Sequence, residues 1–207
     1  MEVIDIVFLV AVIVMSAVVH EVMHGVAANS LGDPTARLEG RLTLNPLPHL
    51  DLFGSIILPA IFVLTQSPLF FAWAKPVPYN PYNLRGGRFS EAIVAGAGPL
   101  ANLAIALLAG LLLRLGLFPG APDIIFTIVV INVMLFIFNL IPIPPLDGSK
   151  VIEAFLPGPL QYAYAGWRRS LELNPFLGFG IVVLIIVFFG GTFGSFVYQV
   201  ARGIAGV

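Results

Sequence analysis

The sequence predicts an all-α membrane protein, a polytopic transmembrane helix bundle of about four to five spans with a short β-hairpin and a re-entrant segment. Hydrophobic residues make up 58% of the 207 residues, and the mean hydropathy is +0.99. Only ten basic and eleven acidic side chains carry a formal charge. A soluble protein of this length needs more polar side chains to cover its surface, so the chain is expected to lie in a lipid bilayer.

Composition also excludes several functional classes. The net charge of −1 leaves no basic surplus, so no nucleic-acid partner is expected. The sequence contains no Cys, which excludes disulfides, thiol catalysis and thiolate metal sites. A metal ion would have to be held by carboxylates and by the three histidines His20, His24 and His49.

Five apolar stretches are candidates for spanning helices, each of which needs about 20 residues to cross about 30 Å of hydrocarbon. They are residues 4–28, 54–73, 92–117, 124–140 and 176–189. The glycines from Gly190 to Gly194 predict the end of the last span, and residues 195–207 predict a second helix at the membrane interface. We expect a single membrane domain over residues 1–207, because no repeat or long polar linker divides the chain.

The N-terminus is predicted to remain as a permanent helix. Glu2 and Asp5 make it acidic where a secretory signal is basic, and the apolar run leads to His20 and Glu21 rather than to a cleavage site.

Two irregular features are expected between the first and third stretches. Alternating residues on either side of Gly40, within residues 33–46, predict the short β-hairpin. The stretch 54–73 has Pro59 at its middle and Pro68 near its end, so a re-entrant segment suits it better than an uninterrupted helix.

The chemistry begins at His20-Glu21-Val22-Met23-His24, in the last third of the first predicted helix. Residues four apart share one helix face, so both imidazoles can reach one metal ion. Glu21 flanks this face, where its carboxylate could touch a metal-bound water. A central charge in a spanning helix costs about 2.5–3.5 kcal/mol on insertion scales, and polar groups there usually mark function. The alternative is that these side chains only hydrogen-bond within a helix bundle.

Two imidazoles do not complete a catalytic zinc site, which usually has three protein ligands. Asp147 is the other carboxylate candidate, because it ends a proline-interrupted run after the fourth stretch and is followed by Gly148. The alternative is an Asp that caps a helix starting near Ser149.

The remaining polar candidates each have two interpretations. His49 is a fourth ligand or a supporting group, or it pairs with Asp51 at the surface. Asn102 and Asn139 are candidates to hydrogen-bond a substrate. The alternative for both, and for Asn132, is a hydrogen bond between helices.

Three segments, in this order, resemble motifs of the site-2 protease family, the intramembrane zinc metalloproteases. They are the HEVMH helix, Gly98-Pro99-Leu100-Ala101-Asn102, and the run from Asn139 to Gly148. The resemblance implies that His20, His24 and Asp147 bind Zn²⁺, that Glu21 is the catalytic acid/base, and that Asn102 lies near the cleft. The chain has no room for the PDZ or CBS domain of better-known branches, so their substrate selection and regulation do not carry over.

A shared metal site sets the topology. His20, His24 and Asp147 lie near the C-terminal ends of their helices, so these helices must run parallel and one intervening stretch must return to its starting side. If that stretch is 54–73, the zinc side carries eight basic residues and the other side two, Arg114 and Arg202; the eight are Arg37, Arg41, Lys75, Arg85, Arg88, Lys150, Arg168 and Arg169. If every stretch crosses, the split is six against four. The positive-inside rule therefore predicts a multi-pass protein of the cell membrane with its active site toward the cytoplasm.

The function expected from these features is zinc-dependent hydrolysis of peptide bonds within or near transmembrane segments of membrane-protein substrates. Substrate unwinding would be assisted by a strand edge, from the hairpin around Gly40 or from residues 142–146. Two alternatives stay open, a catalytically silent metal-binding membrane scaffold and a divalent metal transporter that uses the same His and Asp residues. Glu21 discriminates between them, because a transporter has less need of a carboxylate beside the metal water.

Overall fold

The computed structural model of the chain describes residues 3–57, 61, 64–65 and 74–207. It divides into two compact units, Met1–Arg85 and Gly86–Val207. A single functional domain over 1–207 stays a prediction.

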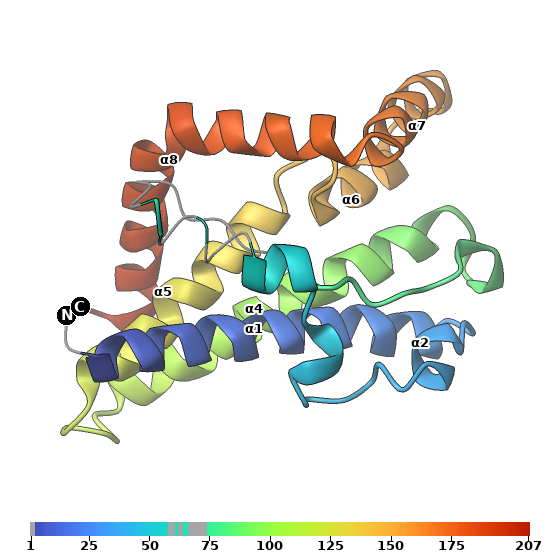
Figure 1. The fold of residues 1–207 in the computed structure, drawn as a ribbon. Helices are drawn as coiled ribbons and strands as arrows, with labels where there is room; N and C mark the ends of the chain where they lie inside the picture. Colours follow the sequence, from blue (N-terminus) through green and yellow to red (C-terminus); the bar gives the residue numbers. More distant parts are fainter. Residues whose placement is uncertain (1–2, 58–60, 62–63, 66–73) are drawn as a thin grey trace. The chain divides into compact units, whose positions relative to one another are not determined.

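The first unit is built on one long helix, α1 (Val3–Ser30), drawn in blue in Figure 1. Short helical turns follow: α2 (Thr35–Leu38), η1 (Leu47–His49), a π-helical turn η2 (Leu52–Ile57), and η3 (Pro81–Asn83). Residues 74–80 form an irregular segment between the last two turns. Lys75 and Val77 in this segment each precede a proline, which biases both toward extended backbone.

The predicted hairpin at residues 33–46 is wrong, because the described residues there contain no strand and Thr35–Leu38 forms α2. Asp33 accepts hydrogen bonds from the Thr35 hydroxyl and amide, and Pro34 begins the turn, so the local bonds favour one helical turn over strand pairing. Residues 142–146 are likewise bends and turns rather than a strand. The proposed re-entrant segment 54–73 lies largely outside the described residues, beyond the turn η2 that overlaps its start.

The second unit is a helical bundle of α4 (Ser90–Arg114), α5 (Pro122–Asn139), α6 (Asp147–Phe155), α7 (Gly158–Glu172) and α8 (Pro175–Ala205). The turn η4 (Gly87–Phe89) precedes α4. Helix α4 packs on α5, α6 and α8. The core consists of small and branched residues from these helices, namely Ala106, Ala109, Ile125, Val129, Val133, Val197 and Ala201.

Helix α8 continues where the sequence predicted an end at residue 189 and a separate helix over 195–207. It remains helical to Ala205, and it changes direction within its length (Figure 1). Arg114 at the end of α4 donates from Nε to the Ile204 carbonyl at 2.8 Å and also bonds the Gly203 carbonyl. The C-terminal part of α8 is therefore held against α4 within the bundle.

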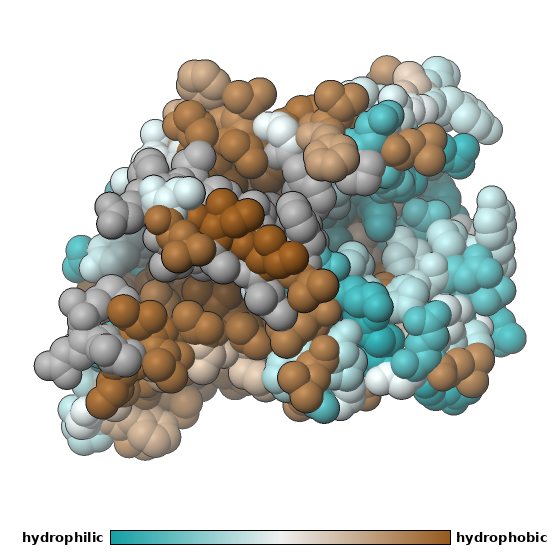
Figure 2. Space-filling model, viewed as in Figure 1, coloured by the Kyte–Doolittle hydropathy of each residue, from teal (hydrophilic) through white to brown (hydrophobic). Residues whose placement is uncertain are grey.

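Four described helices are long and apolar enough to span a membrane: Ile4–Ser30, Gly87–Arg114, Pro122–Asn139 and Phe176–Ala205. Figure 2 shows hydrophobic side chains at the surface over α8 and the N-terminal part of α1, where Ile4, Val7 and Val10 are exposed. Hydrophilic side chains gather near α2 (Figure 2). These features confirm the predicted all-α membrane class.

A polar contact lies inside the second unit. Asn102 of α4 donates from Nδ2 to Oδ1 of Asn132 on α5 at 2.9 Å, and both side chains are fully buried. Asn132 in turn donates to the Ile128 carbonyl of its own helix. The amides therefore bond one another between two apolar helices, as the alternative interpretation of Asn102 anticipated.

We expect Asn102→Ala and Asn132→Ala to be energetically coupled, because each removes the same interhelical bond. The coupling free energy of unfolding, measured in mixed detergent micelles, should be about 0.6 kcal/mol and at most about 1.7 kcal/mol. Asn139→Ala is the control, since Asn139 bonds the Leu135 carbonyl of its own helix. A zero coupling between Asn102 and Asn132 would contradict the interpretation.

Candidate metal centre

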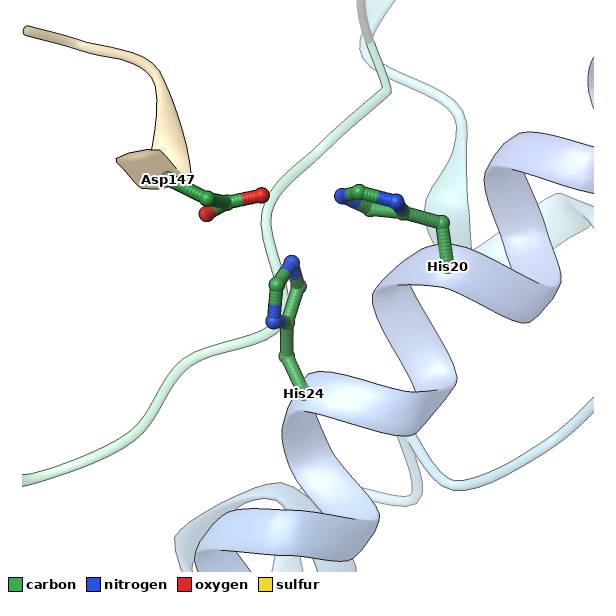
Figure 3. A group of neighbouring side chains, drawn as sticks. All are labelled: His20, His24 and Asp147. Carbon is green, nitrogen blue, oxygen red and sulfur yellow. The ribbon is translucent and has the colours of Figure 1, made fainter. Parts of the chain in front are cut away.

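The histidine pair lies on one face of α1. The ring centroids of His20 and His24 are 4.6 Å apart, the rings are nearly perpendicular, and both side chains are buried. Figure 3 shows them projecting in the same direction from successive turns of the helix. This confirms the helical face that the four-residue spacing predicts.

Glu21 is half-buried beside the pair and has a partner in the irregular segment 74–80. The backbone N–H of Val77 donates to Glu21 Oε2 at 2.9 Å. One carboxylate oxygen is thereby held by the backbone of a residue 56 positions away in the chain.

Close packing keeps this segment against α1. A Cβ atom placed on Gly25 would lie 2.6 Å from a Leu42 methyl carbon, 2.8 Å from Val77 Cγ1 and 3.0 Å from Ala36 Cβ. No side chain fits there without a shift of its neighbours. The glycine directly after the HEVMH motif therefore allows residues 42 and 77 to approach the helix.

Asp147 is the first residue of α6 in the second unit, with Leu146 at the N-cap position. A Cβ atom on Gly148 would lie 2.2 Å from the Leu140 carbonyl oxygen and 2.6 Å from that of Ile141. Only glycine allows this contact between the first turn of α6 and the backbone that follows α5. The absence of a side chain at Gly148 therefore allows the position of Asp147. Asp147 does not cap a helix starting at Ser149, because α6 already begins at Asp147.

His49 is buried rather than at the surface. Its side chain is only 1% exposed, and Nε2 lies 2.9 Å from the Thr43 carbonyl oxygen, to which it donates. Among the described residues, its Nδ1 has no hydrogen-bond partner. The surface pair with Asp51 is therefore wrong, and His49 is a buried group that binds backbone within the first unit.

Asn102 and Asn139 were the predicted substrate contacts. Asn102 bonds Asn132, and Asn139 donates to the Leu135 carbonyl at 2.9 Å while remaining half-buried at the end of α5. A role in substrate binding stays a prediction for both.

Sequence reasoning missed two side chains that organise the first unit, Asp33 and Arg41. Asp33 is fully buried and accepts from the Thr35 hydroxyl at 2.6 Å, the Asn80 amide at 2.6 Å and the Asn83 side chain at 2.9 Å. Burial raises the pKa of Asp33, but these hydrogen bonds outweigh it and the pKa lies below its ordinary value. The Gly32-Asp33-Pro34 turn after α1 was the available signal, although nothing local shows that residues 80 and 83 return to it.

A long apolar helix with a His-Glu-x-x-His motif, in a protein with several apolar helices, indicates a membrane metallopeptidase. Comparisons with known proteins agree. The family model described as "Peptidase family M50" matches residues 117–164. The chain is 35% identical over 200 residues to "Putative zinc metalloprotease YwhC" of Bacillus subtilis, which covers 92% of this chain and 83% of that protein.

Two relatives named "Putative zinc metalloprotease Rip2" are also similar. The protein of Mycolicibacterium smegmatis is 30% identical over 177 residues, with 84% of this chain and 64% of that protein covered. The protein of Mycobacterium tuberculosis strain H37Rv is 27% identical over 190 residues, with 90% and 68% covered. No solved structure matches this chain.

The chain belongs to peptidase family M50, the site-2 protease family, and is a multi-pass membrane zinc metalloprotease that acts on protein. Its cofactor is Zn²⁺.

We expect Asp33→Asn to destabilise the protein at neutral pH by about 1–3 kcal/mol, because one carboxylate oxygen becomes an NH₂ group facing a donor. The folded-state pKa of Asp33 is lowered, so its contribution is present above the unfolded pKa of about 3.9 and is lost as pH falls through the folded pKa. The difference in melting temperature between wild type and Asp33→Asn should therefore be largest near pH 7 and decrease below about pH 4. Glu39→Gln at an exposed position is the control; an equal loss at all pH values would contradict the assignment.

Proposed function

We propose that this protein is an intramembrane endopeptidase that cleaves peptide bonds within or near transmembrane segments of membrane proteins. The observation that carries the proposal is the position of the His20-Glu21-His24 face on α1, within the candidate span Ile4–Ser30. Polar groups in a span are costly and usually functional. A catalytic face at that position suits substrates that also lie in the bilayer.

The proposed Zn²⁺ ligands are His20, His24 and Asp147, the two imidazoles of the α1 motif and the carboxylate at the start of α6. The donor chemistry fits, because two imidazoles and one carboxylate form a common catalytic zinc set that leaves a position for water. Asp147 belongs to the second unit, so this ligand set requires the two units to meet at the metal.

The proposed mechanism assigns the proton transfers to Glu21. When bound, Zn²⁺ lowers the pKa of a coordinated water to about 7 and polarises the attacked carbonyl. Glu21 accepts the Val77 N–H at Oε2, and Oε1 is the oxygen proposed to accept the proton of the attacking water. The same carboxyl group then returns the proton to the leaving amine.

Asn139 and Asn102 are the proposed hydrogen-bonding groups for the substrate backbone. Asn139 suits this role better, because it is half-buried and bonded only within its own helix turn by the described contact. Asn102 would offer only the hydrogen-bonding capacity that its bond with Asn132 leaves.

The active site is proposed to face the cytoplasm, on the grounds of the basic residues of the chain. Because the sequence has no Cys, single cysteines can report the side of each loop. Arg37→Cys, at an exposed position after α1, should react with an impermeant maleimide only after cells are permeabilised. Leu117→Cys, between α4 and α5, should react in intact cells. The reverse pattern would contradict the orientation.

Glu21→Gln should retain bound zinc and lose cleavage of a model transmembrane peptide by at least about 100-fold, because the amide cannot take the proton. His20→Ala should lose both zinc and cleavage. Zinc content and peptide cleavage are measured on the same purified preparations.

Two outcomes would overturn the proposal. Cleavage that survives in Glu21→Gln would remove its acid/base role. Wild-type protein that binds zinc but cleaves no peptide, with zinc flux through vesicles persisting in Glu21→Gln, would favour the transporter.

A further inference from the structure

The segment beside Glu21 has few backbone donors, and its described bonds are all within the first unit. Pro76 and Pro78 have no N–H, so Lys75 and Val77 supply the donors of residues 75–78. The Lys75 N–H donates to the His49 carbonyl at 2.8 Å, and the Val77 N–H donates to Glu21 Oε2 at 2.9 Å. The orientation of the Val77 N–H toward Glu21 therefore depends on the contacts that fix the backbone of residues 75–78.

The Arg41 side chain donates hydrogen bonds to two backbone carbonyls of residues 75–78. Its Nη2 donates to the Lys75 carbonyl at 2.8 Å and to the Pro76 carbonyl at 3.3 Å. The Arg41 side chain is buried, with 5% of the residue exposed. The Pro76 carbonyl belongs to the same peptide group as the Val77 N–H. Arg41 therefore hydrogen-bonds the peptide group that also donates to Glu21.

The burial of Arg41 affects the energetic cost of losing its hydrogen bonds to residues 75 and 76. An arginine costs free energy to bury unless its donors are satisfied. Here Nη2 has two backbone acceptors, the Lys75 and Pro76 carbonyls, whereas Nε has no hydrogen-bond partner among the described residues. The Arg41 backbone is itself fixed, because its N–H donates to the Ala36 carbonyl at 2.9 Å. Arg41 is thus anchored to α2 at one end and to residues 75 and 76 at the other.

Two further contacts restrict the run. His49 bonds the Thr43 carbonyl through Nε2, which fixes the residue whose own carbonyl receives the Lys75 N–H. Asp33 receives the Asn80 N–H, three residues beyond Val77. The peptide unit that faces Glu21 is therefore held on both sides.

We propose that Arg41 is a positioning residue for the reaction, which holds the Pro76–Val77 peptide so that its N–H orients the Glu21 carboxylate. This inference rests on the proposed role of Glu21 as acid/base. Arg41 neither contacts substrate nor binds zinc in this scheme. Arg41 would change the fraction of time in which Glu21 Oε1 is oriented toward the reacting water, which should change kcat and leave KM nearly unchanged.

The test compares Arg41→Ala, Arg41→Lys and Arg37→Ala, which removes an exposed arginine of the same region. Arg41→Ala should keep zinc and lower kcat for a model transmembrane peptide by about 10- to 100-fold, the range expected for one lost bond to a charged group. Arg41→Lys should recover part of the loss. Arg37→Ala should match wild type.

Amide hydrogen exchange gives a readout that does not depend on activity. A peptide covering residues 74–79 reports on Lys75, Val77 and Tyr79, since residues 76 and 78 are prolines. Exchange should accelerate in Arg41→Ala, and it should remain slow in Glu21→Gln, whose side-chain carbonyl still accepts from Val77. Glu21→Ala should accelerate exchange with Arg41 intact.

Unchanged exchange and unchanged kcat in Arg41→Ala would overturn the positioning role, even if Glu21→Gln is inactive as the proposed function requires. Loss of zinc in step with activity would also overturn it, because Arg41 would then act on the metal site as a whole. Full activity in Glu21→Gln would instead defeat the proposed function itself.

Discussion

The low polarity of the bilayer is the constraint on which the rest of this structure depends. Two imidazoles and a carboxylate lie in the last third of α1, a helix otherwise apolar enough to span a membrane. Placing a charge at the centre of such a helix costs about 2.5–3.5 kcal/mol on insertion scales, so each polar group needs a partner. Glu21 finds one in the Val77 backbone, which requires irregular chain to run beside a membrane helix. Such backbone is tolerated at this depth only where protein or a water-filled cavity surrounds it.

The first unit meets this requirement with side chains that bind backbone. Asp33 satisfies the Asn80 amide, Arg41 satisfies the Lys75 and Pro76 carbonyls, and His49 satisfies Thr43. These residues bind the backbone of the segment that contacts Glu21, or of the residues next to it. In the second unit, the position of Asp147 depends instead on close packing of Gly148 against the backbone after α5.

Several sequence-based expectations were confirmed and others were wrong, for physical reasons. The helical face of His20 and His24 follows from local geometry, because residues four apart stack in any α-helix. The hairpin around Gly40 failed because three or four alternating residues cannot outweigh the local bonds of Asp33 with Thr35. The predicted end of α8 failed because glycines only weaken a helix, and packing of its last turns against α4 stabilises it.

The sequence by itself determined the membrane class, the apolar helices and the shared helix face of the His-Glu-x-x-His motif, because hydropathy and helical spacing are local properties. Only the tertiary structure decided which groups support Glu21, that Asn102 pairs with Asn132, and that His49 is buried. Those contacts join residues from 6 to 56 positions apart. Most of these side chains bind backbone groups, which every residue carries. No residue type in the sequence therefore indicates which distant segment will contact them.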